Sequence, residues 1–248
     1  MKPFFPLIFL LAVYAQPVPA AGLGLIPDHH IKAELDPVAR TLEVEDVVRL
    51  GGEGKTLFIL APAFIIEALT VDGGRARYER DGERILIDLG SRGRHAVKFS
   101  YRGDISAEPE GTFIAGGSGW RPSTKAAAFT YRITITTPDR QRAVTGGRLM
   151  EETEGDGFYR ASFQSPVPVS NHYGIDILAG PWRVGERRAG NILLRTYFNP
   201  EIASLSADYL DSAAGYIKRY EAIIGPYPYP AFYMVSGPLQ VGLGLAGM

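Results

Sequence analysis

Short runs of alternating apolar and polar residues, separated by turn residues, extend over most of this sequence. Between residues 31 and 198 the turn signals recur about every eight to twelve residues, with little helical periodicity between them. Asp72-Gly73-Gly74 stands between two such runs and is typical of a β-hairpin turn. The pattern predicts a mainly β, sandwich-like fold, with strands at residues 31–35, 41–50, 57–60, 64–71, 84–89, 95–101, 129–137, 158–163, 174–178, 182–186 and 192–198.

One glycine-rich stretch interrupts this rhythm. Residues 104–125 contain several glycines and prolines, with Phe113 and Trp120 embedded among them. A long loop of this kind inside a compact domain is usually functional or crosses an edge of the sheet. We therefore regard residues 111–120 as a candidate contact loop.

The periodicity changes near the end of the chain. Asn199 is a good N-cap residue, Pro200 suits the first helical position, and apolar residues then recur at intervals of three and four up to Ile224. Gly225-Pro226 would end this helix, and residues 231–235 would form a short apolar strand.

The first residues are typical of a secretory signal peptide. Phe4 to Val13 is an apolar stretch of about ten residues, too short to span a bilayer, and small residues precede a cleavage site after Ala20. We expect a signal peptide at residues 1–20, a β-rich domain at residues 21–198 and the start of a second domain at residues 199–248. The protein would be exported to the periplasm or the extracellular medium, with no transmembrane segment after signal cleavage.

Composition limits the classes of function. Hydrophobic residues make up 46% of the chain and charged residues 21%, which is ordinary for a globular protein. The formal net charge of −1 provides no basic field for nucleic acid or an anionic membrane. Cysteine is absent, so disulfides cannot contribute to stability.

The four histidines do not form a recognisable metal motif. None is followed by glutamate, so the helical His-Glu-x-x-His zinc site is absent. His29 and His30 are adjacent on a predicted strand and would point to opposite faces. His95 and His172 have no obvious partner in the sequence.

Three other patterns are weak candidates for chemistry. Residues 242–247 match the Gly-x-Gly-x-x-Gly dinucleotide fingerprint, but no crossover helix follows them. Ser118 lies in Gly-x-Ser-x-Trp, which lacks the last glycine of a nucleophile elbow. The carboxylate pairs Glu108/Glu110 and Glu151/Glu152 are most simply interpreted as solvated loop charges.

Several stretches together resemble the aminopeptidase N family of zinc metallopeptidases. The most specific is Gly225-Pro226-Tyr227-Pro228-Tyr229, directly after the predicted helix. The others resemble the family's opening strand pair, the loop ahead of its middle strands and the crossing into its catalytic domain, at residues 28–37, 40–44, 110–114, 119–122 and 195–201.

This resemblance implies a saddle-like β-sandwich N-terminal domain, followed by the start (helix plus strand) of an incomplete α/β thermolysin-like domain. The tail would occupy the position of the family's exopeptidase loop, which implies substrate contacts by Ala246, Gly247 and Met248. Only the methionine matches the family's usual Gly-x-Met-Glu-Asn at this point. Some bacterial branches of the family have Gly-Met-Pro-Ser here, which Gly247-Met248 would begin, and such branches leave strict aminopeptidase specificity in doubt.

The family's chemistry depends on zinc, which lowers the pKa of a bound water and polarises the scissile carbonyl while a glutamate acts as general base. The zinc helix lies downstream in the family, so we expect this chain to be truncated before it, with no catalytic or metal-binding residue of its own. Peptide would be the substrate of the full-length protein.

Three hypotheses follow. In the first, the chain is a fragment of an exported zinc metallopeptidase that supplies the non-catalytic β domain and part of the substrate-side wall, and is inactive and free of tightly bound zinc when alone. In the second, it is a stand-alone β-sandwich binding module that uses residues 111–120 as its contact loop. In the third, it is a nucleotide-dependent enzyme.

Overall fold

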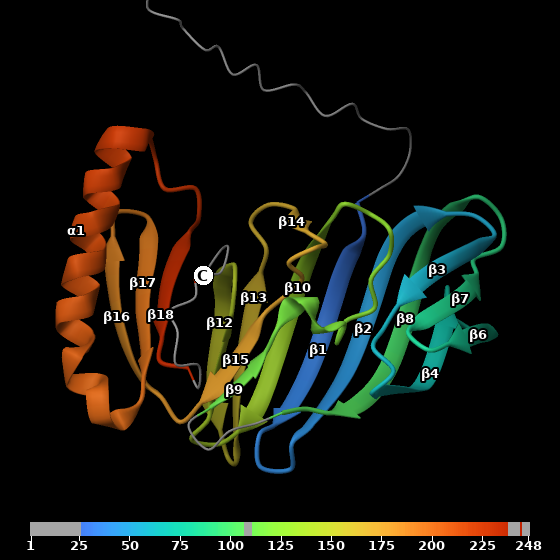
Figure 1. The fold of residues 1–248 in the computed structure, drawn as a ribbon, viewed down its shortest axis with the longest axis horizontal. Coiled ribbons are helices and arrows are strands. Elements are labelled where there is room, and N and C mark those ends of the chain that lie inside the picture. Colours follow the sequence, from blue (N-terminus) through green and yellow to red (C-terminus); the bar gives the residue numbers. More distant parts are fainter. Residues whose placement is uncertain (1–25, 107–110, 238–243, 245–248) are drawn as a thin grey trace, which may run out of the picture.

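The fold is mainly β, as predicted, with one long helix at one end (Figure 1). The computed structural model describes residues 26–106, 111–237 and 244; the predicted signal peptide (residues 1–20) and the predicted substrate contacts Ala246, Gly247 and Met248 lie outside them. In these described parts the strands are β1 (Asp28–Asp36), β2 (Thr41–Gly52), β3 (Lys55–Ile59), β4 (Phe64–Val71), β5 (Gly74–Arg75), β6 (Tyr78–Asp81), β7 (Arg84–Asp88), β8 (Gly93–Asp104), β9 (Thr112–Ile114), β10 (Ala128–Pro138), β11 (Arg142–Thr145), β12 (Arg148–Gly155), β13 (Phe158–Gln164), β14 (Val169–Ser170), β15 (Ile177–Gly180), β16 (Arg183–Ala189), β17 (Ile192–Phe198) and β18 (Ala231–Val235). The helices are η1 (Gly116–Ser118) and η2 (Pro200–Leu205), both 3-10, and α1 (Ser206–Ile224).

A nine-stranded sheet forms the body of the molecule, in the order β12-β13-β10-β1-β2-β8-β4-β5, with β14 also pairing with β10. Its strands are antiparallel to their neighbours except at the centre, where β1 runs parallel to β10. Strand β1 alternates buried and exposed residues along its length, so Ile31, Ala33 and Leu35 enter the core while their neighbours face solvent. This period of two is the pattern that predicted the strand.

Two smaller sheets, β3-β7-β6 and β11-β15-β9, cover the buried face of the large sheet. The ring of Phe58 on β3 meets that of Phe99 on β8 edge to face, with centroids 5.2 Å apart. The glycine-rich stretch contributes β9 to the second small sheet. Its Trp120 is fully buried and donates a hydrogen bond from Nε1 to the carbonyl oxygen of Ile175 at 2.8 Å. Parts of the long predicted loop, including Ile114 and Trp120, thus belong to the core.

The predicted hairpin at Asp72-Gly73 is confirmed. Val71 pairs with Gly74, and the two residues between them have φ angles of 51° and 82°. Two consecutive positive φ values are what a type I′ turn requires, and aspartate followed by glycine tolerates them best.

A third small sheet, β16-β17-β18, carries α1 on one face. Strands β17 and β18 are parallel, and α1 is the crossover that connects them. Leu210, Ala213 and Ile217 of α1 pack on Ile192 and Leu194 of β17 in a hydrophobic cluster of their own. The sheet therefore combines strands from both sides of residue 198, and the boundary between residues 198 and 199 stays a prediction.

The helix begins differently from the prediction. Residues 200–205 form the 3-10 helix η2, and α1 starts only at Ser206. Asn199 precedes η2, but its side chain makes no capping hydrogen bond; its backbone N–H instead donates to Ser236 Oγ at 2.7 Å. The end of the helix at Gly225 is as predicted, with a φ of 103° at that residue.

Candidate functional site

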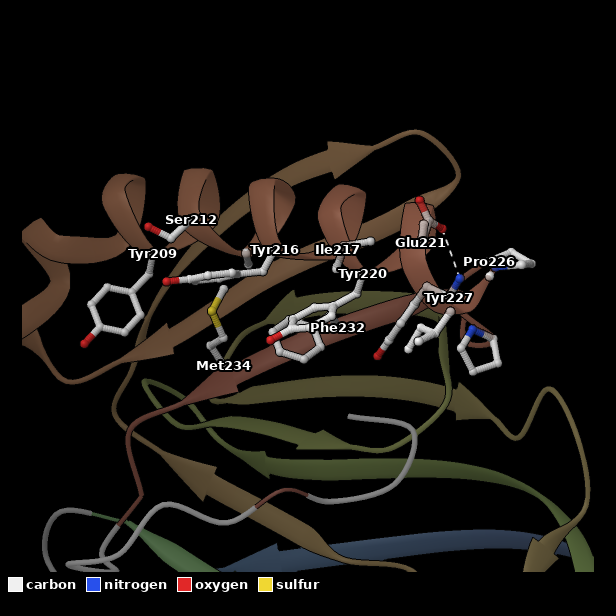
Figure 2. Close-up of a pocket in the computed structure, with 14 residues that line it drawn as sticks. Tyr209, Ser212, Tyr216, Ile217, Tyr220, Glu221, Pro226, Tyr227, Phe232 and Met234 are labelled. Atoms are coloured by element: carbon white, nitrogen blue, oxygen red, sulfur yellow. Dashed lines mark hydrogen bonds between the residues drawn. The ribbon is translucent and has the colours of Figure 1, made fainter. Parts of the chain in front are cut away.

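An aromatic groove lies between α1 and β18 (Figure 2). Its volume is about 810 Å³. Figure 2 shows Tyr216 and Tyr220 reaching from α1 over Met234 and Phe232 of β18. The groove is lined by Tyr209, Ser212, Ala213, Tyr216, Ile217, Tyr220, Glu221, Ile224, Gly225, Pro226, Tyr227, Pro228, Phe232 and Met234.

The helix sequence explains why the groove is apolar. The residues that pack on the sheet recur at helical spacing, but a second apolar stripe lies beside them. Tyr209, Tyr216 and Tyr220 of that stripe are 50%, 59% and 56% exposed, and Ile224 is 81% exposed. A helix that is apolar on more than its core-facing stripe is usually buried on two sides. In the described chain only one side of α1 is covered.

The turn that follows α1 also lines the groove. Tyr227 N–H donates to Glu221 Oε1 at 3.0 Å, which fastens the turn to the last helical turn. Burial, with a smaller effect of neighbouring Tyr229, raises the pKa of Tyr227 to about 12, so its phenol is neutral at ordinary pH. The groove can therefore offer aromatic surface and hydroxyl groups, with Glu221 as its charged lining residue.

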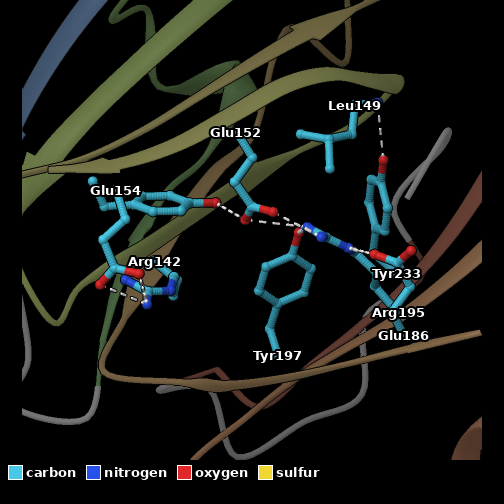
Figure 3. A network of polar contacts seen from close by, with 9 residues as sticks. Arg142, Leu149, Glu152, Glu154, Glu186, Arg195, Tyr197 and Tyr233 are labelled. Atoms are coloured by element: carbon cyan, nitrogen blue, oxygen red, sulfur yellow. Dashed lines mark hydrogen bonds and ion pairs between the residues drawn. The ribbon is translucent and has the colours of Figure 1, made fainter.

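A polar network joins the large sheet to the third small sheet, whose strand β18 lines the groove (Figure 3). Arg195 on β17 donates from Nη2 to Glu152 Oε2 on β12 at 2.7 Å and from Nη1 to Glu152 Oε1 at 3.2 Å. Its Nε donates to Glu186 Oε2 on β16 at 2.7 Å. Tyr159 on β13 donates to Glu152 Oε1 at 2.6 Å. We call these four residues the junction network.

The junction network places charges where burial would otherwise disfavour them. Burial alone would raise the pKa of Glu152, but hydrogen bonds from Arg195 and Tyr159 outweigh it and lower that pKa. Burial alone would lower the pKa of Arg195, but the carboxylate of Glu152 and its other partners raise it. Each group therefore keeps the other charged. Glu152 is a correction to the sequence analysis, because it belongs to a strand and pairs with Arg195 instead of being a solvated loop charge.

Tyr233 adds a second connection at the junction. Its hydroxyl donates to the carbonyl oxygen of Gly147 at 3.0 Å and accepts from the N–H of Leu149 at 3.2 Å. Its ring stands edge to face against those of Tyr197 and Phe163. Strand β18 is thereby fixed to the turn before β12 as well as to β17.

Three of the four histidines pair with an aspartate. The two adjacent histidines do point to opposite faces: His29 is buried, whereas His30 is exposed beside Asp28 at 2.9 Å. His95 binds Asp72 at 2.8 Å, and this hydrogen bond raises the pKa of His95. His172 lies exposed in a turn.

The described residues do not fit a zinc ion. Among them no group of three or more His, Cys, Asp or Glu side chains could hold a metal. The buried histidine, His29, uses Nδ1 for Asp46 and Nε2 for Arg121, so neither nitrogen is free for a ligand bond. We derive no catalytic step through zinc from these residues.

The remaining sequence candidates are not brought together. Ser118 lies exposed at the end of η1, and no helix follows it in the way that a nucleophile elbow requires. Glu151 is exposed on β12, while Glu108 and Glu110 lie outside the described residues. Of residues 111–120 only Gly117 and Ser118 are exposed. The glycine fingerprint at residues 242–247 is outside the described chain except for Gly244.

No helix in the described parts of the chain is long and apolar enough to cross a membrane.

The functional residues that sequence reasoning missed are Arg195 and Glu152. The signal for Arg195 was present, since it is a charged residue in the otherwise apolar run of β17. The signal for its partner was not, because β12 is mostly polar and exposed.

Comparison with known proteins identifies the fold. No protein-family model matches the sequence, and no curated protein matches it. Among solved structures, the chain is similar to an M1 zinc metallopeptidase from Deinococcus radiodurans, with a TM-score of 0.69 at 16% sequence identity, over 87% of this chain and 57% of that one. The fold is that of the β domain of M1 zinc metallopeptidases.

Two further structures agree. A two-domain M1 zinc metallopeptidase variant bound to L-arginine matches with a TM-score of 0.68 at 16% identity, over 88% of this chain and 59% of that one. The same kind of variant bound to L-tryptophan matches with a TM-score of 0.68 at 17% identity, over the same shares. At this identity the likeness shows the fold alone, and the chain spans less than two thirds of the length of these structures.

Proposed function

We propose that this chain is the N-terminal portion of an exported zinc peptidase that acts on peptides in the manner of the aminopeptidase N family. It supplies the β domain and the first layer of the catalytic domain, and residues beyond those described here supply the zinc ligands and the general base. The observation that supports this most directly is the aromatic groove on a fold similar to 57% of an M1 zinc metallopeptidase.

The groove supports the proposal because of its position. It lies on α1 and β18, the last helix and strand that the structure describes, and the match covers only 57% of the solved metallopeptidase. In the described residues β18 pairs with β17 alone, so its other edge is available to a further strand. An apolar helix face next to an unpaired strand edge suits continuation of the same sheet and its covering layer.

In the proposed protein this chain positions the substrate site and does no chemistry itself. The junction network would hold the first strands of the catalytic domain against the β domain. Ala246, Gly247 and Met248 would contribute to the wall that receives the peptide. When bound in the full-length protein, zinc would activate a water for attack on the peptide carbonyl.

The test compares residues 21–248 with a longer polypeptide that includes whatever the coding sequence specifies after Met248. We expect bound zinc, measured by atomic absorption, and hydrolysis of aminoacyl anilides only in the longer polypeptide. Stoichiometric zinc together with turnover by residues 21–248 would overturn the proposal. A longer polypeptide that neither binds zinc nor cleaves peptides would overturn it too, and would favour the stand-alone binding module.

Hydrogen exchange separates the groove from the rest of the fold. The amides of α1 should exchange more slowly in the longer polypeptide than in residues 21–248, because the groove is then covered. The amides of β4, at the other end of the molecule, serve as the control and should not change (Figure 1). Equal exchange of α1 in both polypeptides would contradict the proposed packing. Recovery of the protein from the periplasm or the medium would test its export.

A further inference from the structure

A buried polar cluster lies inside the β domain, far in sequence from the aromatic groove. It consists of His29, Asp46, Tyr101 and Arg121, whose exposed fractions are 1%, 0%, 1% and 4%. Three strands and the segment after η1 contribute one residue each. Buried ionisable groups of this kind require partners, because an unpaired buried charge strongly destabilises the folded state.

Sheet register brings the strand residues together. Asp46 on β2 stands opposite Ile31 on β1 and Phe99 on β8. His29 and Tyr101 each lie two residues from those direct partners, so they face the same side of the sheet as Asp46 and are its diagonal neighbours.

His29 connects the two charges of the cluster. Its Nδ1 lies 2.7 Å from Asp46 Oδ2, and its Nε2 lies 2.9 Å from Arg121 Nη1. Arg121 has only donors, so Nε2 must accept and Nδ1 must carry the proton that is donated to Asp46. Burial is the main reason that the pKa of His29 is lowered. A neutral imidazole thus links a carboxylate to a guanidinium.

Arg121 fastens the glycine-rich segment to this cluster. Its Nη2 donates to Asn171 Oδ1 at 2.7 Å, and its Nη1 also donates to the carbonyl oxygen of Pro122 at 3.0 Å. The guanidinium lies over the ring of Phe129, 3.9 Å from its centroid. Both terminal nitrogens are therefore used, while Nε is not.

Three atoms of the cluster remain without a protein partner: Asp46 Oδ1, Tyr101 Oη and Arg121 Nε. The described residues contain seven such buried side-chain atoms, so nearly half of them fall in this one cluster. Each would be destabilising if it were left unsatisfied, because burial removes its hydrogen bonds to bulk water. The three are complementary, since one accepts, one donates and the hydroxyl can do either.

We propose that the buried polar cluster holds one internal water molecule. The water accepts a hydrogen bond from Arg121 Nε, donates one to Asp46 Oδ1 and shares a third with the hydroxyl of Tyr101. Three bonds to polar groups are typical of a buried water. An ion is disfavoured, because Arg121 opposes a cation and Asp46 opposes an anion.

The water completes a closed network that joins β1, β2 and β8 to the segment carrying Trp120. Its ligands come from two strands and one connecting segment, so it acts as a cross-link between parts of the chain distant in sequence. It explains how a fully buried carboxylate and guanidinium can share a core with aromatic side chains.

A high-resolution crystal structure of the protein tests this directly. We expect an ordered water within about 2.7–3.2 Å of all three atoms. An empty site, or a hydroxyl of Tyr101 that binds Asp46 directly, would refute the proposal.

The variant Tyr101→Phe gives a second test whose sign depends on the water. With the water present, loss of the hydroxyl removes a hydrogen bond and the urea midpoint of unfolding falls. Without it, the substitution removes an unsatisfied buried hydroxyl and the midpoint rises. Tyr131→Phe is the matched control, because the hydroxyl of Tyr131 donates directly to the carbonyl oxygen of Gly146 at 2.8 Å and its loss lowers the midpoint in either case. A midpoint for Tyr101→Phe at or above that of the unaltered protein would contradict the water.

Discussion

The junction network leads to a prediction about Glu152→Gln. Glu152 is 28% exposed and accepts two hydrogen bonds from Arg195 and one from Tyr159. Glutamine keeps the shape but presents one acceptor oxygen and loses the charge, so at least one charge-assisted hydrogen bond to a buried guanidinium is lost. Such bonds contribute about 1.5–3 kcal/mol, and we expect the free energy of unfolding to fall by about 2–3 kcal/mol.

Glu154→Gln is the matched control on the same strand. Glu154 also accepts two hydrogen bonds from an arginine, Arg142, at 2.9 and 2.8 Å, but it is 58% exposed. An exposed pair of this kind contributes about 0–1 kcal/mol. Urea unfolding can be followed by tryptophan fluorescence, because Trp182 packs edge to face on Tyr197 beside the junction network. Equal losses in the two variants would refute the reasoning that burial, and not the number of hydrogen bonds, sets the contribution.

The contribution of Glu152 should also depend on pH. Its pKa is lowered from 4.5 in the folded chain, so its stabilising effect is present above that value and disappears as the pH falls through the folded pKa. The difference between the unaltered protein and Glu152→Gln should therefore shrink towards zero at acid pH. A difference that stays constant down to the acid transition would mean that the charge is not its cause.

Two further predictions concern the β domain. Burial between Asp46 and Arg121 lowers the pKa of His29 from 6.5, so as the pH falls the unfolded chain takes up a proton before the folded one. The free energy of unfolding should therefore fall below about pH 6.5, by up to about 1.4 kcal/mol per pH unit. Urea midpoints of the unaltered protein and of His29→Gln, measured between pH 5 and 8, test this, and the same pH dependence in both proteins would contradict it. Gly116→Ala should lower the free energy of unfolding by about 1–3 kcal/mol, because the new methyl group would lie 2.3 Å from a backbone oxygen. In the control Gly117→Ala the new methyl group would have no atom within 4 Å, so the thermal midpoint should change little. Similar midpoints for the two variants would show that the backbone near Gly116 can move to make room.

The strands that sequence reasoning predicted best are those with one buried face. In β2 the inward positions Leu42, Val44, Val48 and Leu50 alternate with exposed residues, and Asp46 occupies an inward position as well. Strand β12 could not be found in this way. Its residues are almost all exposed and polar, because it is an edge strand of the large sheet, and nothing in its pattern favours a strand over a loop.

The candidate site was only partly visible in the sequence. The apolar stripe of α1 was recognised, but its division into a packed side with Leu210 and an exposed side with Tyr216 depends on which residues the sheet covers. The ion pair between Arg195 and Glu152 joins residues 43 apart on different sheets, and no local pattern reports such a contact. Periodicity alone predicted a mainly β fold with one long helix. The stretches that resemble a known family were needed to predict the arrangement of these elements.

The parallel pairing of β1 and β10 affects the order in which the chain can fold. Asp28 pairs with Thr130, 102 residues further along, whereas β1 and β2 meet across a short turn. Closing so long a loop costs entropy before any contact compensates it, so this pairing should form late and slowly. As the polypeptide emerges during synthesis, the β1 edge that faces β10 stays open until β10 has followed. During that interval the half-made sheet presents unpaired backbone to any other chain nearby, which makes it the stage at which the protein most needs a chaperone.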